Sequence, residues 1–187
     1  MLYLVSGSSR SGKTTIAQRI LKQEGIPYLS LDWIMMGFTN GMPEFGIHDK
    51  LWPDEIAKRL ESFLVAMCES VLWTGQNLVI EGEAILPQSA RGLIVSHPEQ
   101  VRACFLGFAN VDIDQKVREA KTYSSGERDW LTEESDATIR NHIKNMVEHS
   151  RLIEAQCKAN GIQYFDTSTG FLATIDEATA YLLSPSG

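Results

Sequence analysis

Residues 2–15 read LYLVSGSSRSGKTT, and this stretch decides how the rest of the chain is interpreted. The apolar run over residues 2–5 is typical of a buried parallel strand. Residues 7–14 then match the pattern G-x-x-x-x-G-K-[ST] of a phosphate-binding loop. Beyond the loop, Ile16 and Ile20 begin an apolar stripe at helical spacing. Strand, glycine-containing loop and helix therefore follow one another in the order that the motif requires.

The residue types of this loop suit the chemistry of phosphate. Gly7 and Gly12 permit a tight turn with backbone N–H groups pointing inward, at the positive end of the helix dipole. Lys13 can reach the β- and γ-phosphates, and the Thr14 hydroxyl can bind Mg²⁺. The motif predicts a binding site for a nucleoside triphosphate or diphosphate. The predicted nucleotide-binding residues are Gly7, Ser8, Ser9, Arg10, Ser11, Gly12, Lys13, Thr14 and Thr15.

The length and composition are those of one globular unit. The 187 residues suit a single domain spanning 1–187, and 43% hydrophobic with 22% charged residues is ordinary for such a protein. A net charge of -7 argues against a nucleic acid or an anionic membrane as partner, because both attract basic surfaces. No apolar run approaches the roughly 20 residues of a membrane span.

The cysteines indicate the redox environment of the protein. Cys68, Cys104 and Cys157 lie in apolar segments without metal-ligand spacing, so we interpret them as small core residues. An odd number of unpaired cysteines is typical of a reducing environment. The first predicted strand begins at residue 2, and no signal peptide is visible before it. We therefore expect a cytoplasmic protein.

Apolar segments alternate with helical patterns along the rest of the chain. Five strands separated by helices predict a three-layer α/β fold with a doubly wound parallel sheet, whose strand order the pattern does not fix. The further strands are expected at residues 26–31, 78–80, 101–108 and 162–165. The first helix is expected to run from the loop to Gly25 and the second from Pro53 to Gly75, with at most a short helix within residues 84–100. A further helix should begin at a cap at Asn110 and end at Tyr123, and a long one should begin within residues 132–135 and end at Asn160. The last should begin at a capping box formed by Thr174 and Glu177 and end near Leu183.

Asp32 follows the second predicted strand and starts a segment without a clean period. Ligands of open α/β sheets bind beyond the carboxyl ends of the strands, so Asp32 should share an edge with the phosphate loop. We expect residues 33–50, with three glycines and several aromatics, to be a substrate-covering loop. The alternative is a surface excursion whose aromatics pack on the core. The segment contains Lys50 but no arginine, which favours an uncharged or aromatic ligand over a multiply phosphorylated one.

Glu81 stands at the carboxyl end of the third predicted strand. Phosphate-loop enzymes place there the carboxylate that orders Mg²⁺ or its water ligands, usually as an aspartate. Thr14 and Glu81 are therefore the predicted metal residues.

From the loop to the last helix, the layout resembles the small phosphate-loop kinases, which include the nucleoside monophosphate, shikimate and gluconate kinases and the antibiotic phosphotransferases. The resemblance implies the sheet order 2-3-1-4-5 and the fold of the phosphate-loop NTPases. It also implies that Asp32 binds the acceptor hydroxyl or takes its proton. The nucleoside monophosphate kinases carry a proline–arginine dipeptide after the third strand. Here Pro87 and Arg91 are four residues apart, which disfavours a nucleotide acceptor.

The same resemblance implies a short lid over residues 121–132, which contains Arg128. Arg118 would be the first arginine of this lid, and Arg140 a second phosphate-binding arginine on the returning helix. Solvated helix charges are the alternative interpretation of each. Residues 166–168 match the loop that borders the adenine.

The expected function is Mg²⁺-dependent transfer of the γ-phosphoryl group of ATP to a small-molecule acceptor. Lys13, Asp32, Arg118 and Arg140 are the predicted catalytic residues. The interpretation as a GTP-dependent switch is disfavoured, because the sequence has no Asn-Lys-x-Asp signature for guanine and no Asp-x-x-Gly after the third predicted strand. A nucleotide-binding regulator or slow NTPase without an acceptor is the remaining alternative.

Overall fold

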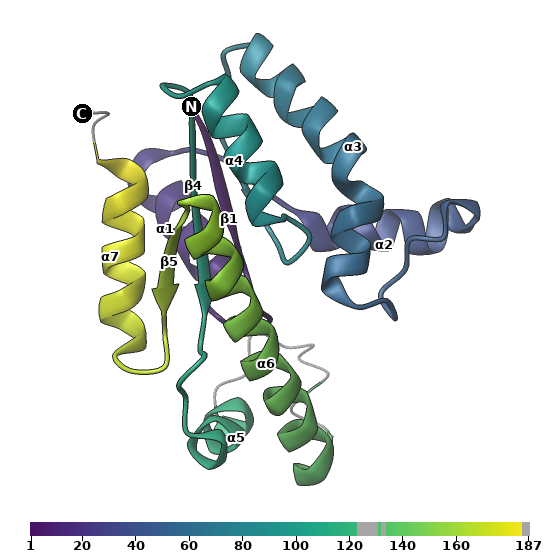
Figure 1. Cartoon of the computed structure of the whole chain (residues 1–187), viewed down its shortest axis with the longest axis vertical. Coiled ribbons are helices and arrows are strands. Elements are labelled where there is room, and N and C mark those ends of the chain that lie inside the picture. The colour runs from purple at the N-terminus through teal and green to yellow at the C-terminus, as the bar shows by residue number, and fades with distance from the viewer. Residues whose placement is uncertain (123–130, 132–133, 185–187) are drawn as a thin grey trace.

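The computed structural model describes residues 1–122, 131 and 134–184, and it contains a five-stranded parallel sheet. The strand order is β2-β3-β1-β4-β5, as the resemblance implied. Figure 1 shows the helices on both faces of this sheet. The strands are β1 (Leu2–Gly7), β2 (Tyr28–Ser30), β3 (Leu78–Glu81), β4 (Val101–Gly107) and β5 (Gln163–Asp166). The helices are α1 (Lys13–Glu24), α2 (Leu31–Gly41), α3 (Pro53–Trp73), α4 (Pro87–Ser96), α5 (Ile113–Thr122), α6 (Asp136–Asn160) and α7 (Phe171–Leu183), with a 3-10 turn η1 (Pro43–Phe45).

Strand β1 lies at the centre of the sheet, between β3 and β4. All six of its residues are buried, which explains the continuous apolar run that begins the sequence. Its side chains alternate between the two faces. Leu2 and Leu4 pack with α2, α3, α4 and α6, whereas Tyr3 and Val5 pack with α1 and α7. The central strand thus joins two hydrophobic layers and directs its carboxyl end into the phosphate loop.

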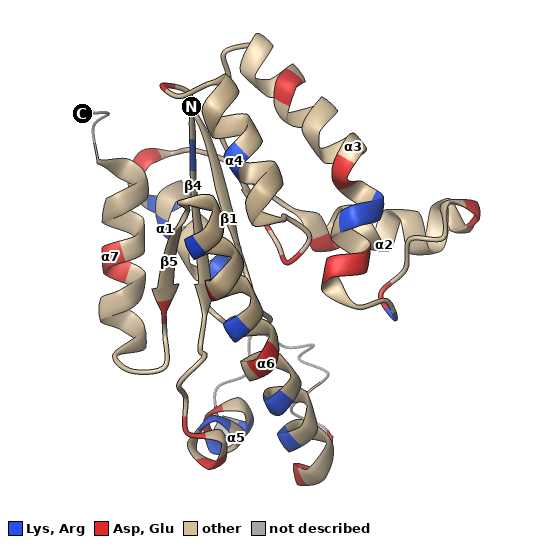
Figure 2. Cartoon of the chain, in the orientation of Figure 1, with Lys and Arg blue, Asp and Glu red and all other residues tan. Residues whose placement is uncertain are grey.

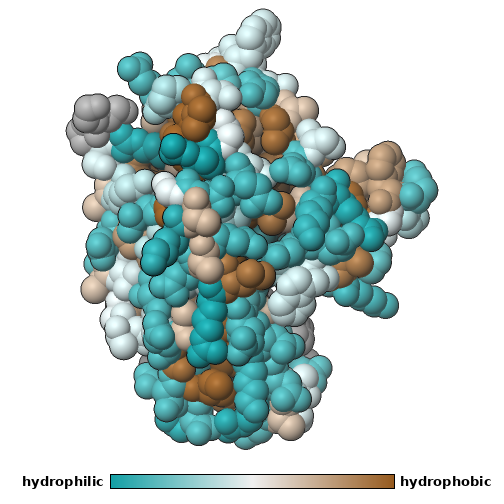
Figure 3. Space-filling model, in the orientation of Figure 1, coloured by the Kyte–Doolittle hydropathy of each residue, from teal (hydrophilic) through white to brown (hydrophobic). Residues whose placement is uncertain are grey.

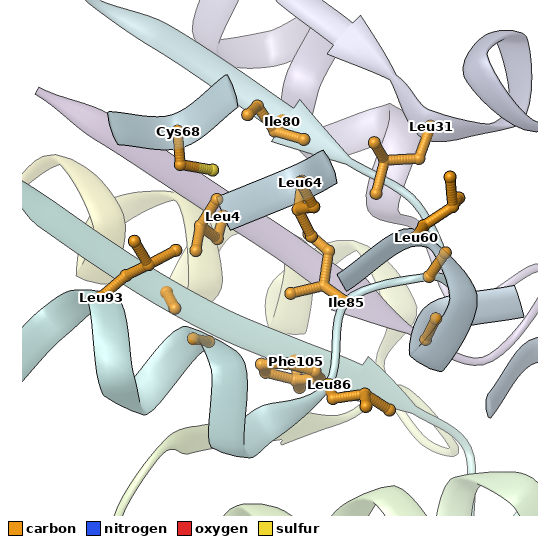
Figure 4. Close-up of a cluster of buried hydrophobic side chains, with 14 of the residues drawn as sticks. Leu4, Leu31, Leu60, Leu64, Cys68, Ile80, Ile85, Leu86, Leu93 and Phe105 are labelled. Carbon is orange, nitrogen blue, oxygen red and sulfur yellow. The ribbon is translucent and has the colours of Figure 1, made fainter. Parts of the chain in front are cut away.

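The larger layer fills the space between the sheet and α3, α4 and α6. Figure 4 shows its side chains converging from both helices and strands, with Leu4, Ile80 and Phe105 from the sheet facing Leu64 and Leu93. The three cysteines are buried and free, as expected for small core residues. Hydrophobic groups on the face seen in Figure 3 are scattered among hydrophilic ones instead of forming one patch.

Helix α2 corrects the sequence analysis, which expected residues 33–50 to be a loop. Residues 31–41 are helical, and η1 follows. The apolar residues Leu31, Met35 and Phe38 repeat at helical spacing and pack on the large core layer. Two glycines of low helix propensity, Gly37 and Gly41, obscured this stripe. Packing of one apolar face outweighs their cost.

Two caps also differ from expectation. Helix α5 begins at Ile113, and the Asp112 carboxylate, not Asn110, accepts the backbone N–H of Gln115 at 2.7 Å. The last helix begins at Phe171 after Gly170, which has a φ of 67°, so the expected capping box at residues 174–177 lies inside the helix. Helix α6 ends at Gly161 and α1 at Gly25, as predicted.

Within the part of the chain that the structure describes, no helix is both long and apolar enough to cross a membrane.

Alanine at Gly7 is expected to destabilise the fold by about 2–3 kcal/mol, because its Cβ would lie 1.9 Å from the Leu106 carbonyl oxygen of β4 and the φ of Gly7 is 135°. Gly37→Ala is the matched control, since open space surrounds this helical position. Alanine there should stabilise by roughly 0.5–1 kcal/mol. Urea unfolding of both variants measures the difference, and equal stabilities would contradict the close strand packing at Gly7.

Candidate active site

The loop between β1 and α1 turns through residues with positive φ. Gly7 has a φ of 135° and Gly12 one of 104°, while Arg10 adopts the left-handed value of 62°. The Ser8 N–H donates to the Leu106 carbonyl at 3.0 Å, which fixes the loop entrance to β4. This backbone leads directly into the first turn of α1, where free N–H groups and the helix dipole favour a phosphate.

A buried hydroxyl contact joins the loop to α6. The Ser8 side chain is fully buried, and its Oγ lies 2.8 Å from Ser150 Oγ. Ser150 Oγ also accepts the N–H of Phe108, just after β4, at 3.0 Å. Ser150 could not be predicted from the sequence, because an isolated serine on a helix carries no local signal of this contact. It helps to fix the loop against the end of β4.

Lys13 is held inside the loop that it follows. Its side chain is buried, and its ammonium group donates to the Ser8 carbonyl at 2.8 Å. The same group lies 3.9 Å from Oε1 of Glu83, which belongs to the segment after β3. An ammonium group has three donors, so these two contacts leave capacity for a phosphate oxygen.

Glu81 and Thr14 are in contact. The Thr14 hydroxyl donates to Glu81 Oε2 at 3.1 Å, and Glu81 is only 2% exposed. The parallel register places Glu81 opposite both Val5 and Ser30. A buried carboxylate beside a hydroxyl, without a cationic partner among the described residues, suits a divalent cation. The donor set fits the predicted Mg²⁺, although the described residues contain no group of three or more His, Cys, Asp or Glu that could hold a metal.

Asp32 is the second residue of α2, in its first turn, where a carboxylate complements the helix dipole. Its side chain is exposed and has no hydrogen bond or ion pair within the described residues. It lines a cavity of about 550 Å³, a size typical of small-molecule sites. Ser9 of the phosphate loop lines the same cavity. The structure therefore brings Asp32 and the loop to one space, as the sequence predicted.

The other walls of the cavity come from distant parts of the chain. Residues 49–56 supply Asp49, Trp52 and apolar side chains, and the N-terminal half of α6 supplies His142 and Met146. Glu83 and Ala84 close the side nearest to β3. In Figure 2, acidic residues (red) mark the starts of α2 and α3.

Trp52 contacts a buried histidine, His149. The rings of Trp52 and His149 meet edge to face with centroids 5.6 Å apart. His149 is 2% exposed, and its Nε2 lies 3.1 Å from Oδ1 of Asp54. This hydrogen bond lowers the pKa of Asp54. The contact joins α6 to the start of α3, so it fixes the cavity wall that carries Trp52.

The two predicted arginines lie away from this cavity. Arg140, on α6, forms an ion pair with Asp114 of α5, and Arg118 is exposed on α5. Neither lines the cavity. Most of the predicted lid, including Arg128, lies outside the described residues.

Residues 166–168, predicted to border the adenine, are tied to the segment after β4. The Asn110 side chain donates to Asp166 at 2.8 Å, and its backbone N–H donates to Ser168 Oγ at 2.9 Å. Lys116 lies over the rings of Phe108 and Phe171, at 5.0 and 5.9 Å from their centroids. These contacts give a fixed surface beside the phosphate loop.

Comparison with solved structures places this arrangement among known folds. A shikimate kinase from Bacteroides thetaiotaomicron superimposes with a TM-score of 0.56 at 17% identity, over 97% of this chain and 98% of the other. A sugar kinase from a Janibacter species gives 0.54 at 16% identity, covering 97% and 93%. The fold is that of the small phosphate-loop kinases.

A third kinase-fold structure is a shikimate kinase from Acinetobacter baumannii in complex with shikimate, with a TM-score of 0.53, 14% identity and coverage of 97% and 92%. No protein-family model matches this chain, and no curated protein matches it in sequence. At these identities the likeness establishes the fold alone.

Proposed function

We propose that this protein is a Mg²⁺-dependent kinase that transfers the γ-phosphoryl group of ATP to a hydroxyl group of a small molecule. One observation carries the proposal. The phosphate loop opens, at Ser9, onto a cavity of about 550 Å³ that Asp32 also lines. A protein that only binds or slowly hydrolyses a nucleotide has no need of such a cavity beside the γ-phosphate position. The fold shared with shikimate and sugar kinases agrees with the proposal.

Phosphoryl transfer depends mainly on alignment and charge neutralisation. The Lys13 ammonium group and the loop N–H groups would bind the β- and γ-phosphate oxygens. Thr14 and Glu81 would hold Mg²⁺, which supplies further positive charge to the phosphates when it is bound. These residues neutralise the donor.

Asp32 would act on the acceptor. Its carboxylate accepts a hydrogen bond from the acceptor hydroxyl and orients the oxygen toward the γ-phosphorus. A new P–O bond forms to this oxygen while the bond from the γ-phosphorus to the β–γ bridging oxygen breaks, which leaves ADP. The hydroxyl proton passes to Asp32 late in the reaction. Arg140 would have to leave its ion pair with Asp114 before it could bind the transferred phosphoryl group.

The direct test is to incubate the protein with ATP and Mg²⁺ and to add candidate acceptors one at a time. ADP release should be slow without an acceptor and should rise strongly with the correct one, with phosphate appearing on the acceptor. A constant rate of ADP release, with all phosphate found as inorganic phosphate, would instead establish a simple NTPase.

Glu81→Gln is expected to raise the Mg²⁺ concentration for half-maximal activity by roughly tenfold or more, because the buried carboxylate loses its charge while the amide oxygen still accepts from Thr14. ATP affinity without metal should change little. Titration of activity against Mg²⁺ measures the shift, and the exposed Glu99→Gln serves as control. An unchanged half-saturation would make Glu81 a structural partner of Thr14.

A further inference from the structure

The charged residues that the described part of the chain contributes to the cavity wall are all acidic. Asp32, Asp49 and Glu83 contribute carboxylates, and no lysine or arginine within residues 1–122, 131 and 134–184 lines it. A cavity that selects a carboxylate or phosphate ligand would need cationic donors at its wall. The described walls instead favour a positively charged group.

The three carboxylates have different surroundings. Glu83 lies 3.9 Å from the Lys13 ammonium group, so part of its charge is already balanced. Asp32 faces the acceptor hydroxyl in the proposed mechanism. Asp49 has no hydrogen bond or ion pair in the described part of the chain. Its charge is therefore available to a ligand.

His142 also lines the cavity but does not offset the negative charge of these carboxylates. Burial lowers its pKa, and the charge of nearby Arg10 lowers it further, so both effects favour the neutral ring. Arg10 itself does not line the cavity. The wall formed by α6 thus adds no positive charge.

Trp52 places an aromatic ring three residues from Asp49. The side chain is 45% exposed and lines the cavity, and its ring meets His149 edge to face. The hydrogen bond between His149 and Asp54 holds this histidine in place. An aromatic ring and a carboxylate that line the same cavity favour an ammonium or guanidinium group, which can gain from both.

We propose that the acceptor is a small hydroxylated cation, such as an amino sugar, whose charged nitrogen is bound by Asp49 and Trp52 while its hydroxyl group faces Asp32. The inference rests on the proposed kinase function and specifies its substrate class. It distinguishes this cavity from one that takes an anionic acceptor such as shikimate.

The test uses acceptors of similar size that differ in charge. Glucosamine, glucose and gluconate form one series, and ethanolamine, ethylene glycol and glycolate form another. Phosphoryl transfer with ATP and Mg²⁺ gives kcat/KM for each compound, and calorimetry with a non-hydrolysable ATP analogue gives its affinity. The cation is expected to exceed its neutral counterpart by roughly tenfold or more, and the anion should be poorest. A neutral or anionic compound that equals the cation would overturn the inference.

Two variants test whether Asp49 produces the preference for a cationic acceptor. Asp49→Asn should reduce the ratio of cation to neutral kcat/KM by roughly tenfold, mainly through KM. Glu44→Gln is the matched control, because Glu44 is exposed in the same connecting segment and does not line the cavity. Raising the salt concentration should weaken the preference of the native protein, since screening acts on the same contact. If the ratio of cation to neutral kcat/KM in Asp49→Asn equals that of Glu44→Gln, Asp49 does not bind the cation and the inference is wrong.

Failure of the kinase proposal gives a different result from failure of this inference. If no compound of any charge accepts phosphate, the proposed function fails. The calorimetric series then still decides the preference. Binding of the cations that Asp49→Asn abolishes supports a cation site, whereas no binding of any cation overturns it.

Discussion

Replacement of Lys13 by alanine is expected to lower phosphoryl transfer by about a hundred- to a thousandfold. The ammonium group is the cation that the sequence motif supplies to the β- and γ-phosphates. Loss of such a contact to the transition state costs on the order of 3–4 kcal/mol. Single-turnover transfer with ATP and Mg²⁺, measured with saturating acceptor, reports the change in the chemical step.

The fold should survive this change. Lys13 donates one hydrogen bond to the Ser8 carbonyl and lies near the partly exposed Glu83, which water can solvate in its absence. The loss of one such hydrogen bond, about 1 kcal/mol, corresponds to a melting temperature lower by about 2–4 °C. Lys22→Ala, at the exposed end of α1, is the control for removal of a lysine from the same helix. If purified Lys13→Ala turns over as fast as the native protein, the phosphate loop does not take part in the reaction.

Asp32→Asn is the second large effect, and it separates a kinase from a nucleotide binder. Asp32 lies in the first turn of α2, is exposed to the cavity, and shares that cavity with Ser9 of the loop. Asparagine keeps the shape but can neither take a proton nor carry the charge that orients a hydroxyl. Transfer to the acceptor should fall by roughly 10²–10⁴-fold, as is typical of lost general-base assistance.

Nucleotide affinity and background hydrolysis should change far less, because the loop contacts of Ser8, Lys13 and Thr14 do not involve Asp32. Asp49→Asn is the matched comparison: it removes another carboxylate from the same cavity but should alter KM for a cation instead of kcat. Native transfer rates in Asp32→Asn would show that Asp32 is not the base. A collapse of nucleotide affinity would assign it to the metal shell.

The features that depend on residues close together in the chain could be predicted from the sequence. The phosphate loop needs a buried strand, glycines at two positions of positive φ and a helix start, all within fourteen residues. Strands β1 and β4 were visible because nearly every residue in them is buried, so they read as apolar runs. The strand order came from the resemblance, since local pattern carries no information about which strands pair.

Helix α2 shows the limit of local interpretation. Its stripe at Leu31, Met35 and Phe38 was present in the sequence, but glycines and aromatics suggested a loop. Helix propensity is a weak preference, and packing against the core decided the outcome. The cap of α5 also differs from the local prediction. It is Asp112, because Asn110 instead bonds to Asp166 at the end of β5 and to Ser168 just after it.

The surroundings of the phosphate loop depend on contacts between residues that are far apart in the chain. Ser8 meets Ser150 across 142 residues, and Asp54 meets His149 across 95. Helix α6 makes both contacts because it docks beside β4 and reaches the start of α3. The cavity joins Asp32, Asp49 and Glu83 from three separate segments, and it leaves Arg118 and Arg140 outside. Spacing along a chain encodes secondary structure, whereas the approach of distant side chains is fixed by the packing of whole helices on the sheet.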